Sequence, residues 1–260
     1  MAMITKYMKK EIKKSYFYKQ YNYLRALKEK RMWSFRDQQM KEFYSFFLTP
    51  GDLCFDVGAN IGNRTKIFLS LGVKVIAFEP QEDCVKVLKK LYGKNQKLII
   101  IDKALGQMEG EADFFIADGN TISSFSSDWI SAVKRSGRFS ENSWTAPRSV
   151  KMTTLDKMIE MFGIPEFIKI DVEGFESQVL EGLSQPINYL SIEYTPEYRE
   201  NTEKCMIHLS SLGRFKTNFS IGESLKFTFQ DWVSWDELNK YLEKYSGNAS
   251  IWGDIYFKYY

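Results

Sequence analysis

The sequence predicts an α/β domain with a doubly wound, mostly parallel sheet, preceded by a helical extension. Two observations lead to this prediction: short apolar runs alternate with stretches of helical periodicity, and Pro50-Gly51 separates them from a front segment without Pro or Gly. The chain has 260 residues, of which 44% are apolar. That is enough for one packed domain plus an extension, and it excludes a globally disordered chain.

Residues 49–260 carry the alternating pattern and form the expected catalytic domain. Apolar runs predict strands at 53–57, 73–78, 97–101, 166–171, 188–194, 214–219 and 251–258. Helical periodicity predicts helices at 63–71, 81–92, 154–162, 174–182, 202–212 and 234–245. This alternation of strand and helix is typical of a doubly wound, Rossmann-like sheet.

Residues 1–48 form the second expected region, a basic helical extension with helix predicted over 3–47. It contains 12 Lys or Arg and 4 Asp or Glu, whereas residues 49–260 contain 24 and 29. Three roles remain open for it: packing on the domain or on a second subunit of a homodimer, contact with an anionic membrane surface, and nucleic-acid binding. The acidic body and the lack of a recognition motif argue against nucleic acid.

The cysteine and histidine content excludes several kinds of site. Cys54, Cys84 and Cys205 are widely spaced, which argues against a disulfide framework or a thiolate zinc site and favours a reducing compartment. Because His208 is the single histidine of the sequence, a His-rich metal centre is excluded. His208 falls in a predicted helix, and its role is either packing or that of a catalytic base. No run of 18 apolar residues and no signal-peptide hydrophobic region are present, so we expect a cytoplasmic protein.

A polar insertion at residues 118–148 interrupts the alternating pattern. It contains eight serines and no clear periodicity. A loop of this length is either a cover for the ligand site or a solvated insertion, and its position after the third strand lets it reach the carboxyl ends of the sheet. Its aromatic residues, Trp129 and Trp144, suit either a sugar surface or a core.

A glycine-rich turn at residues 55–62, FDVGANIG, ends the first predicted strand. Gly58 and Gly62 allow the backbone to turn sharply and to approach a ligand, while Ala59 and Asn60 lie between them. The following helix directs its N–H groups and positive dipole end into the same crevice. The turn differs from the dinucleotide fingerprint because Asp56 precedes the glycines, where it would repel a pyrophosphate and attract a cationic ligand.

The next two strands end in residues that suit a nucleoside. Glu79 follows the second strand, where a carboxylate can accept both hydroxyls of a ribose. Lys103 and the small Ala104 follow the third strand, where an adenine ring could lie. Together with Asp56, these positions describe a positively charged molecule that carries a nucleoside, and S-adenosylmethionine meets that description.

The segments FDVGANIGNRT, AFEP, KALG and KIDVEGFESQVLEG resemble the FkbM-type family of S-adenosylmethionine-dependent class I methyltransferases. The resemblance covers roughly residues 38–260. It implies a seven-stranded sheet of order 3-2-1-4-5-7-6 with an antiparallel seventh strand, and O-methylation of sugars or natural products. It also implies a cofactor site, to which we assign Asp56, Gly58, Ala59, Asn60, Gly62, Glu79, Lys103, Ala104 and Asp171.

The fourth strand ends in a second charged segment, Lys169-Ile-Asp171-Val-Glu173. Strand alternation places the three charged side chains on one side if the strand persists that far. Asp171 is the first choice for orienting or deprotonating the acceptor hydroxyl, or for holding the amino group of the cofactor. Glu173 is the second choice. The alternative is that both residues cap the helix expected near Gly174. Lys169 would serve as the base only if burial lowered its pKa.

Glu193 ends the fifth strand and is expected to face the same crevice as Asp171. We include it among the catalytic residues. The two carboxylates could also ligate Mg²⁺, but two acids at strand ends are weak evidence, and we assign no metal ligand.

The sequence therefore predicts an enzyme that transfers a methyl group from S-adenosylmethionine to a hydroxyl group, with a sugar or glycan as the acceptor. Two alternatives remain: a methyltransferase for another acceptor (a natural product, lipid, protein or nucleic acid), and a non-catalytic module that binds S-adenosylmethionine. The absence of an Asn/Asp-Pro-Pro-Tyr segment after the fourth strand argues against methylation of nucleic-acid bases.

Overall fold

The computed structural model describes residues 32–117, 123–137, 142–144, 147–245 and 250–260. Two compact units divide the chain, Met1–Gln38 and Gln39–Tyr260. The second unit thus begins before the boundary expected at residue 49, because Tyr44, Phe47 and Leu48 are buried in its core. The predicted helix over residues 3–31 lies outside the described residues.

Helix α3 spans Phe35–Tyr44, so the prediction of one continuous helix to residue 47 is wrong. Its start is fixed locally by Ser34 and Asp37. The backbone N–H and the hydroxyl of Ser34 donate to Asp37 Oδ2 over 2.7 and 2.8 Å, and the Asp37 N–H donates back to Ser34 Oγ over 3.1 Å. This reciprocal cap satisfies N–H groups that a helix start leaves without partners.

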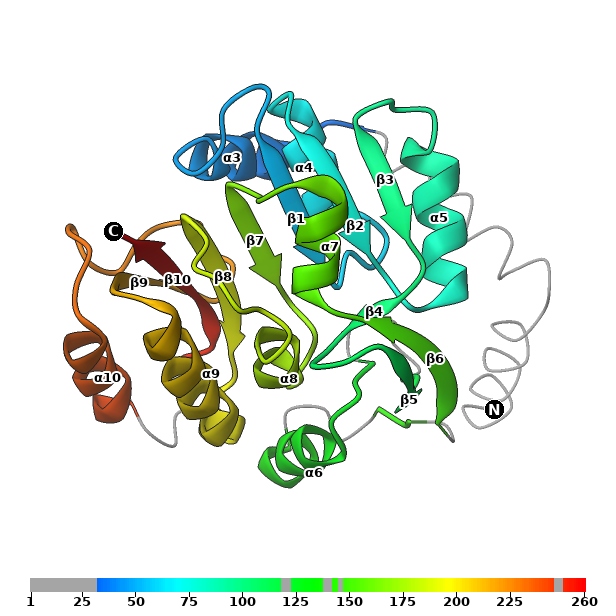
Figure 1. The fold of residues 1–260 in the computed structure, drawn as a ribbon. Coiled ribbons are helices and arrows are strands. Elements are labelled where there is room, and N and C mark those ends of the chain that lie inside the picture. The colour runs from blue at the N-terminus through cyan, green and yellow to red at the C-terminus, as the bar shows by residue number, and fades with distance from the viewer. Residues whose placement is uncertain (1–31, 118–122, 138–141, 145–146, 246–249) are drawn as a thin grey trace, which may run out of the picture. The chain divides into compact units, whose positions relative to one another are not determined.

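The central sheet contains seven strands within the described residues and runs in the order β3-β2-β1-β7-β8-β10-β9 (Figure 1). The strands are β1 (Leu53–Val57), β2 (Lys74–Phe78), β3 (Leu98–Ile101), β7 (Phe167–Ile170), β8 (Tyr189–Tyr194), β9 (Phe215–Ile221) and β10 (Gly253–Tyr259). Strand β10 is antiparallel to both of its neighbours, and the other pairs are parallel. The predicted strands, their order and the antiparallel seventh strand are confirmed.

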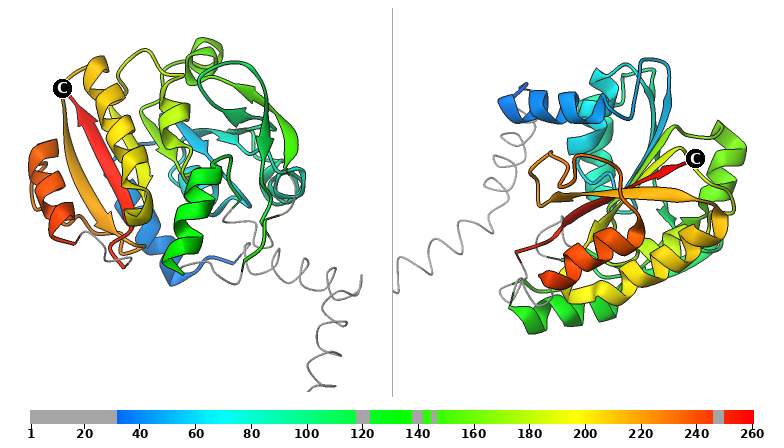
Figure 2. Two further views of the ribbon diagram at one scale, coloured as in Figure 1. Left: turned by 90° about the horizontal axis from the view of Figure 1, so that it is seen from below. Right: turned by 90° about the vertical axis from the view of Figure 1, so that its left-hand side faces the viewer.

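Helices cover both faces of this sheet (Figure 2). On one face, α4 (Asn63–Ser70), α5 (Glu82–Tyr92) and the later residues of α3 pack on the strands. The opposite face carries α7 (Leu155–Phe162), α8 (Glu176–Leu180), α9 (Arg199–Leu212) and α10 (Trp235–Lys244). The six predicted helices are confirmed, although α8 begins at Glu176 rather than 174. Helix α9 begins at Arg199, directly after a 3₁₀ turn at Pro196–Tyr198.

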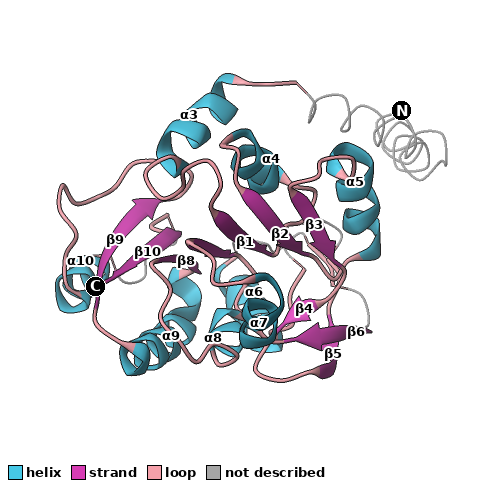
Figure 3. Ribbon diagram, turned by 45° about the horizontal axis from the view of Figure 1, so that its top comes forward, coloured by secondary structure: helices cyan, strands magenta, loops and turns pink. Residues whose placement is uncertain are grey.

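A second, three-stranded sheet was not predicted (Figure 3). Its order is β4-β6-β5, with β4 at Ala104–Leu105, β5 at Gly110–Phe114 and β6 at Arg148–Thr153. Helix α6 (Ser127–Ser136) lies within the insertion, where we expected no regular structure. Ser126 caps it by accepting a 3.0 Å hydrogen bond from the Trp129 N–H, and Trp129 and Val133 are buried.

None of the helices in the described part of the chain has both the length and the apolar character that a membrane span requires.

Candidate functional site

A cavity of about 490 Å³ lies where β1, β2, β7 and β8 end. Its walls come from the loops that follow these strands, from the start of the small sheet and from the insertion. Residues assigned from the sequence that line it are Asp56, Gly58, Ala59, Asn60, Glu79, Lys103, Ala104, Lys169, Asp171, Glu173 and Glu193. The structure therefore brings together nearly all of the predicted site residues.

Gly58, directly after β1, lies close against the backbone of Asp171 at the end of β7. Its φ is +81°, and a Cβ placed on it would lie 1.9 Å from the carbonyl oxygen of Asp171. The N–H groups of Gly58 and Ala59 each donate a 3.0 Å hydrogen bond to the Phe78 carbonyl at the end of β2. Only glycine fits here, because both the backbone conformation and the space exclude a side chain.

Gly62 does not line the cavity, unlike the other assigned residues of the glycine-rich turn. A Cβ on Gly62 would lie 2.7 Å from side-chain atoms of both Leu88 and Tyr92, and its φ is +88°. The structure thus gives Gly62 a packing role, since it lets α4 start close against α5, and its assignment to the cofactor stays a prediction.

The Glu79 carboxylate is held in the cavity wall by two backbone groups. Asn60 donates its N–H to Glu79 Oε2 over 2.8 Å, and Gln81 donates its N–H to Oε1 over 2.7 Å. The side chain is 3% exposed. Burial raises the pKa of Glu79 to about 7, although the hydrogen bonds from Gln81 and Asn60 act in the opposite direction.

Asp56 is a second buried carboxylate in the wall of the cavity. Thr65 of α4 donates its hydroxyl to Asp56 Oδ2 over 2.6 Å. Burial raises the pKa of Asp56 to about 6, and the Thr65 hydrogen bond and the charge of Lys169 limit this rise. Asp56 is thus oriented by the helix that follows the glycine-rich turn.

The wall near Lys103 and Ala104 includes three residues that sequence reasoning missed: Phe114, Ser123 and Phe125. The ring of Phe125 packs on Phe114, with centroids 4.5 Å apart. Two of the three belong to the insertion, so the predicted contact of the insertion with the ligand crevice is supported. Only its position in the chain signalled this; the residue types did not.

Lys169 lies at the other end of the cavity and is 1% exposed. Its Nζ is 3.1 Å from Asp171 Oδ2 and 3.1 Å from Asp254 Oδ1. Burial lowers the pKa of Lys169, but the two carboxylates outweigh burial and hold it well above its ordinary value. The condition for Lys169 as a base is therefore not met, and the amine stays protonated.

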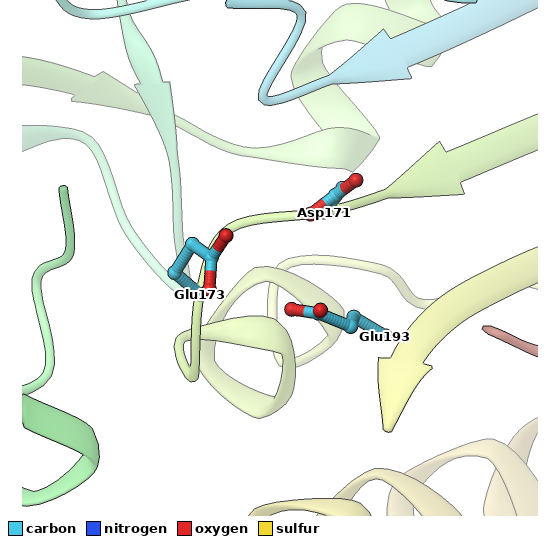
Figure 4. A group of neighbouring side chains, drawn as sticks. All are labelled: Asp171, Glu173 and Glu193. Carbon is cyan, nitrogen blue, oxygen red and sulfur yellow. The ribbon is translucent and has the colours of Figure 1, made fainter. Parts of the chain in front are cut away.

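Three carboxylates surround a small space beside Lys169 (Figure 4). Asp171 and Glu173 lie on the loop after β7, and Glu193 lies at the end of β8; one oxygen of each lies within 4.8 Å of the others. Strand β7 ends at Ile170, and Glu173 adopts a left-handed conformation with φ +54°, so a turn rather than strand alternation places it here. The grouping was predicted, but the reason for it was not.

Glu193 is the most deeply placed acid of this group. No hydrogen-bond partner among the described residues reaches its Oε2, which is buried. Burial raises the pKa of Glu193 well above the ordinary value, and the nearby Asp171 and Glu176 raise it further. Burial thus favours the protonated form of Glu193, which offers one O–H donor as well as acceptor lone pairs.

The helix-capping alternative for Asp171 and Glu173 is not what the structure shows. Glu176, the first residue of α8, accepts the N–H groups of Val172 and Gly174 at Oε1 over 3.3 and 3.2 Å. Its side chain is buried and tethers the loop that carries Asp171 and Glu173. Asp171 and Glu173 both line the cavity.

For the aromatic residues of the insertion and for His208, the sequence left a packing reading and a functional reading open. Trp129 is 1% exposed and does not line the cavity, since its ring packs directly under Gly174. His208 also lies away from the cavity, with Nε2 2.9 Å from the carbonyl oxygen of Leu183. Trp129 therefore has a packing role, and His208 is not a catalytic base. Trp144 does not line the cavity either, and Lys134 Nζ lies 4.7 Å from its ring centroid.

Three further lining residues were not predicted: Arg64, Glu223 and Trp252. Arg64 of α4 donates to Glu223 Oε1 over 2.8 Å. Trp252 directly precedes β10 and lies near Gly222, where a Cβ would be at an ordinary contact distance of 3.6 Å from its ring. The segments after β9 and before β10 gave no sequence signal that they return to this crevice.

Comparison with known proteins adds a family and several relatives. The sequence description of the methyltransferase FkbM domain matches residues 56–246. The hexuronic acid methyltransferase AglP of Haloferax volcanii is 28% identical over 148 residues, which are 55% of this chain and 55% of that protein. This chain thus spans about half the length of that curated relative.

Two solved structures are distant neighbours. An rRNA methylase from Streptococcus thermophilus is 10% identical, with a TM-score of 0.46 over 88% of this chain and 98% of that chain. A TehB-like SAM-dependent methyltransferase from Corynebacterium glutamicum is 9% identical, with a TM-score of 0.44 over 85% of this chain and 88% of that chain.

Proposed function

Since the chain belongs to the FkbM methyltransferase family, we propose that it is an S-adenosylmethionine-dependent O-methyltransferase whose acceptor is a hydroxyl group of a sugar or glycan. The observation that carries this proposal is that Gly58, directly after β1, and Glu79, directly after the neighbouring strand β2, line the same cavity. Gly58 keeps the backbone of two strand ends close and free of side chains, and Glu79 presents a fixed carboxylate to the same cavity.

The residues of the cavity fit S-adenosylmethionine. Glu79 would accept the ribose hydroxyls, because a carboxylate oxygen that already accepts one backbone N–H retains a second lone pair. Ala104 and Lys103 would flank the adenine ring, and Ala59 and Asn60 would border the ribose. Asp56 adds negative charge below a cationic ligand, and Asp171 is the remaining assigned contact.

When bound, S-adenosylmethionine supplies an electrophilic methyl carbon on a positively charged sulfonium. The protein must place the acceptor oxygen opposite the sulfur and remove its proton. Placement alone can provide about 7–11 kcal/mol of the barrier, and a positioned base adds about 10²–10⁴-fold in rate.

Asp171 is the proposed base or orienting group for the acceptor hydroxyl. Its side chain is 39% exposed, so it is accessible from the cavity, and the ammonium of Lys169 fixes one of its oxygens. Burial favours the protonated form of Glu193, which can donate a hydrogen bond to a second acceptor hydroxyl, and Glu173 can accept one. Three carboxyl groups within one small space suit a ligand with several hydroxyls.

Two further observations support a sugar or glycan. Trp252 lines the cavity, as do Glu193 and Glu223, and an aromatic face suits the C–H surface of a sugar ring. The relative from Haloferax volcanii acts on a hexuronic acid, according to its name.

The test is to incubate the protein with isotopically labelled S-adenosylmethionine and a panel of free sugars, glycans and lipids, and to locate the label by mass spectrometry. We expect the label on a sugar hydroxyl, with transfer by Asp171→Asn slowed by about 10²–10⁴-fold. Transfer to a lipid would contradict the proposed acceptor. If calorimetry detects no binding of S-adenosylhomocysteine, the proposed cofactor is wrong as well.

A parallel incubation after dialysis against EDTA addresses the metal. We expect unchanged transfer, because Asp171, one of the three carboxylates, is already paired with Lys169. Loss of transfer that Mg²⁺ restores would contradict a metal-free site.

A further inference from the structure

The buried ammonium of Lys169 links the cavity to a carboxylate outside it. Lys169 is 1% exposed and contacts Asp171, which lines the cavity, and Asp254, which does not. Both distances are 3.1 Å. A buried charge is tolerated only when it is paired and hydrogen-bonded, and here the pairing reaches from β7 to β10.

Strand pairing brings Asp254 to this place. Strand β10 runs antiparallel to β8, and its early residue Asp254 lies opposite Glu193 near the carboxyl end of β8. The Tyr256 hydroxyl donates to Asp254 Oδ2 over 3.3 Å, while Oδ1 is the atom nearest Lys169. The Asp254 side chain is 14% exposed and is thus held from two sides.

We propose that Asp254 is a positioning residue for Asp171 and acts through Lys169. This inference rests on the proposed function, in which Asp171 handles the acceptor hydroxyl. Asp254 is a second anchor for Nζ, which restricts the movement of the ammonium away from Asp171. The negative charge of Asp254 also shares the attraction of Lys169, so Lys169 is not held by Asp171 alone.

Removal of the Asp254 charge has a defined electrostatic consequence. In Asp254→Asn, Lys169 attracts Asp171 alone and one nearby negative charge is gone, and both changes favour the ionised form of Asp171. The other charged or titratable groups that act on Asp171 stay in place in this variant. These groups are Asp56 on β1, Lys169 on β7, Glu173 in the loop after β7, Glu176 on α8 and Glu193 on β8.

The first measurement does not depend on turnover. The carboxyl ¹³C signal of Asp171 is identified by its loss in Asp171→Asn and is then followed against pH. In Asp254→Asn, we expect its titration midpoint to fall by on the order of one pH unit. An unchanged midpoint in a folded Asp254→Asn protein would overturn the inference, whether or not a methyl acceptor is known.

The second measurement is kinetic. We expect Asp254→Asn to lower kcat about tenfold and Asp254→Leu more strongly, while KM for S-adenosylmethionine stays within about twofold. The amide of Asn still accepts a hydrogen bond from Lys169, so the Asn variant retains part of the effect. Wild-type kcat in both variants would overturn the inference while leaving the proposed function intact.

Tyr259→Phe is the matched control. Tyr259 lies on the same strand, and its hydroxyl donates a 2.9 Å hydrogen bond to the carbonyl of Leu209, away from Lys169. We expect this variant to lower stability without changing kcat or the Asp171 titration. If Tyr259→Phe lowers kcat as much as Asp254→Asn does, general damage to β10 explains both effects and the inference falls.

Discussion

The backbone N–H of Asn60 donates a 2.8 Å hydrogen bond to Glu79 Oε2, which ties the glycine-rich turn after β1 to the end of β2. Gln81 donates its N–H to the other oxygen over 2.7 Å. The carboxylate is therefore positioned by main-chain groups on both sides, yet burial raises its pKa to about 7.

The affinity for S-adenosylhomocysteine should consequently rise with pH. Ribose hydroxyls donate to the ionised carboxylate of Glu79, so the proton and the ligand compete below about pH 7. Between pH 6 and pH 8 we expect about a tenfold gain in affinity, measured by calorimetry. Glu79→Gln should bind more weakly and lose most of this dependence. Equal wild-type affinity at both pH values would show that Glu79 does not meet the ribose.

Gly58→Ala should destabilise the protein by roughly 2–4 kcal/mol, measured as the free energy of unfolding. The new Cβ would lie 1.9 Å from Asp171 O, which forces the ends of β1 and β7 apart. Gly137→Ala is the control, because Gly137 has a φ of +82° and nothing within 4 Å of its Cβ position. The two residues thus share the backbone strain and differ in the clash. Equal losses in both variants would show that the close approach to Asp171 is unimportant.

Asp171→Asn should lower kcat by about 10²–10⁴-fold while the dissociation constant for S-adenosylhomocysteine changes only a few-fold. The amide keeps the size of the side chain but cannot take a proton. Asp113→Asn, at an exposed position of β5, serves as the control and should leave kcat unchanged. Near-normal kcat in Asp171→Asn would contradict the role of Asp171 as the base. Glu173 would then be the next candidate, and Glu173→Gln would test it.

Trp252→Ala should raise KM for the acceptor about tenfold with little change in cofactor affinity, because an apolar contact surface of the acceptor end is removed. Steady-state kinetics at saturating S-adenosylmethionine measure this effect. Trp144→Ala is the comparison, since Trp144 does not line the cavity, and its kinetics should match the wild type. A larger effect at Trp144 than at Trp252 would contradict this placement of the acceptor.

The main sheet could be predicted because its parallel strands β1, β2, β3 and β7 are short, mostly apolar runs with Gly, Pro or Asp close to their ends. The small sheet could not, since β4 has two residues and β5, GEADF, is mostly exposed and polar. Helix α6 was missed for a similar reason: serines surround Trp129 and Val133, and only their burial against other elements reveals the helical face.

The candidate site was predictable where a residue acts through its own strand end, as with Asp56, Glu79 and Asp171. It was not predictable where the environment comes from distant parts of the chain. The protonation of Lys169 depends on Asp254, which lies 85 positions further along the chain. Gly62 was assigned to the cofactor from its place in the glycine-rich turn. Its packing against Leu88 and Tyr92 of another helix leaves no local sequence pattern, so it could not be predicted.

Strand β10 lies between β8 and β9 although it follows both of them along the chain. While the ribosome is still making the protein, β9 has no partner on that side, and the sheet can close only after residues 253–259 have emerged. Those residues bring the second counterion of Lys169. A nascent chain that is released before this segment would lack Asp254, the second counterion of Lys169. We therefore expect only chains that contain residues 253–259 to catalyse methyl transfer.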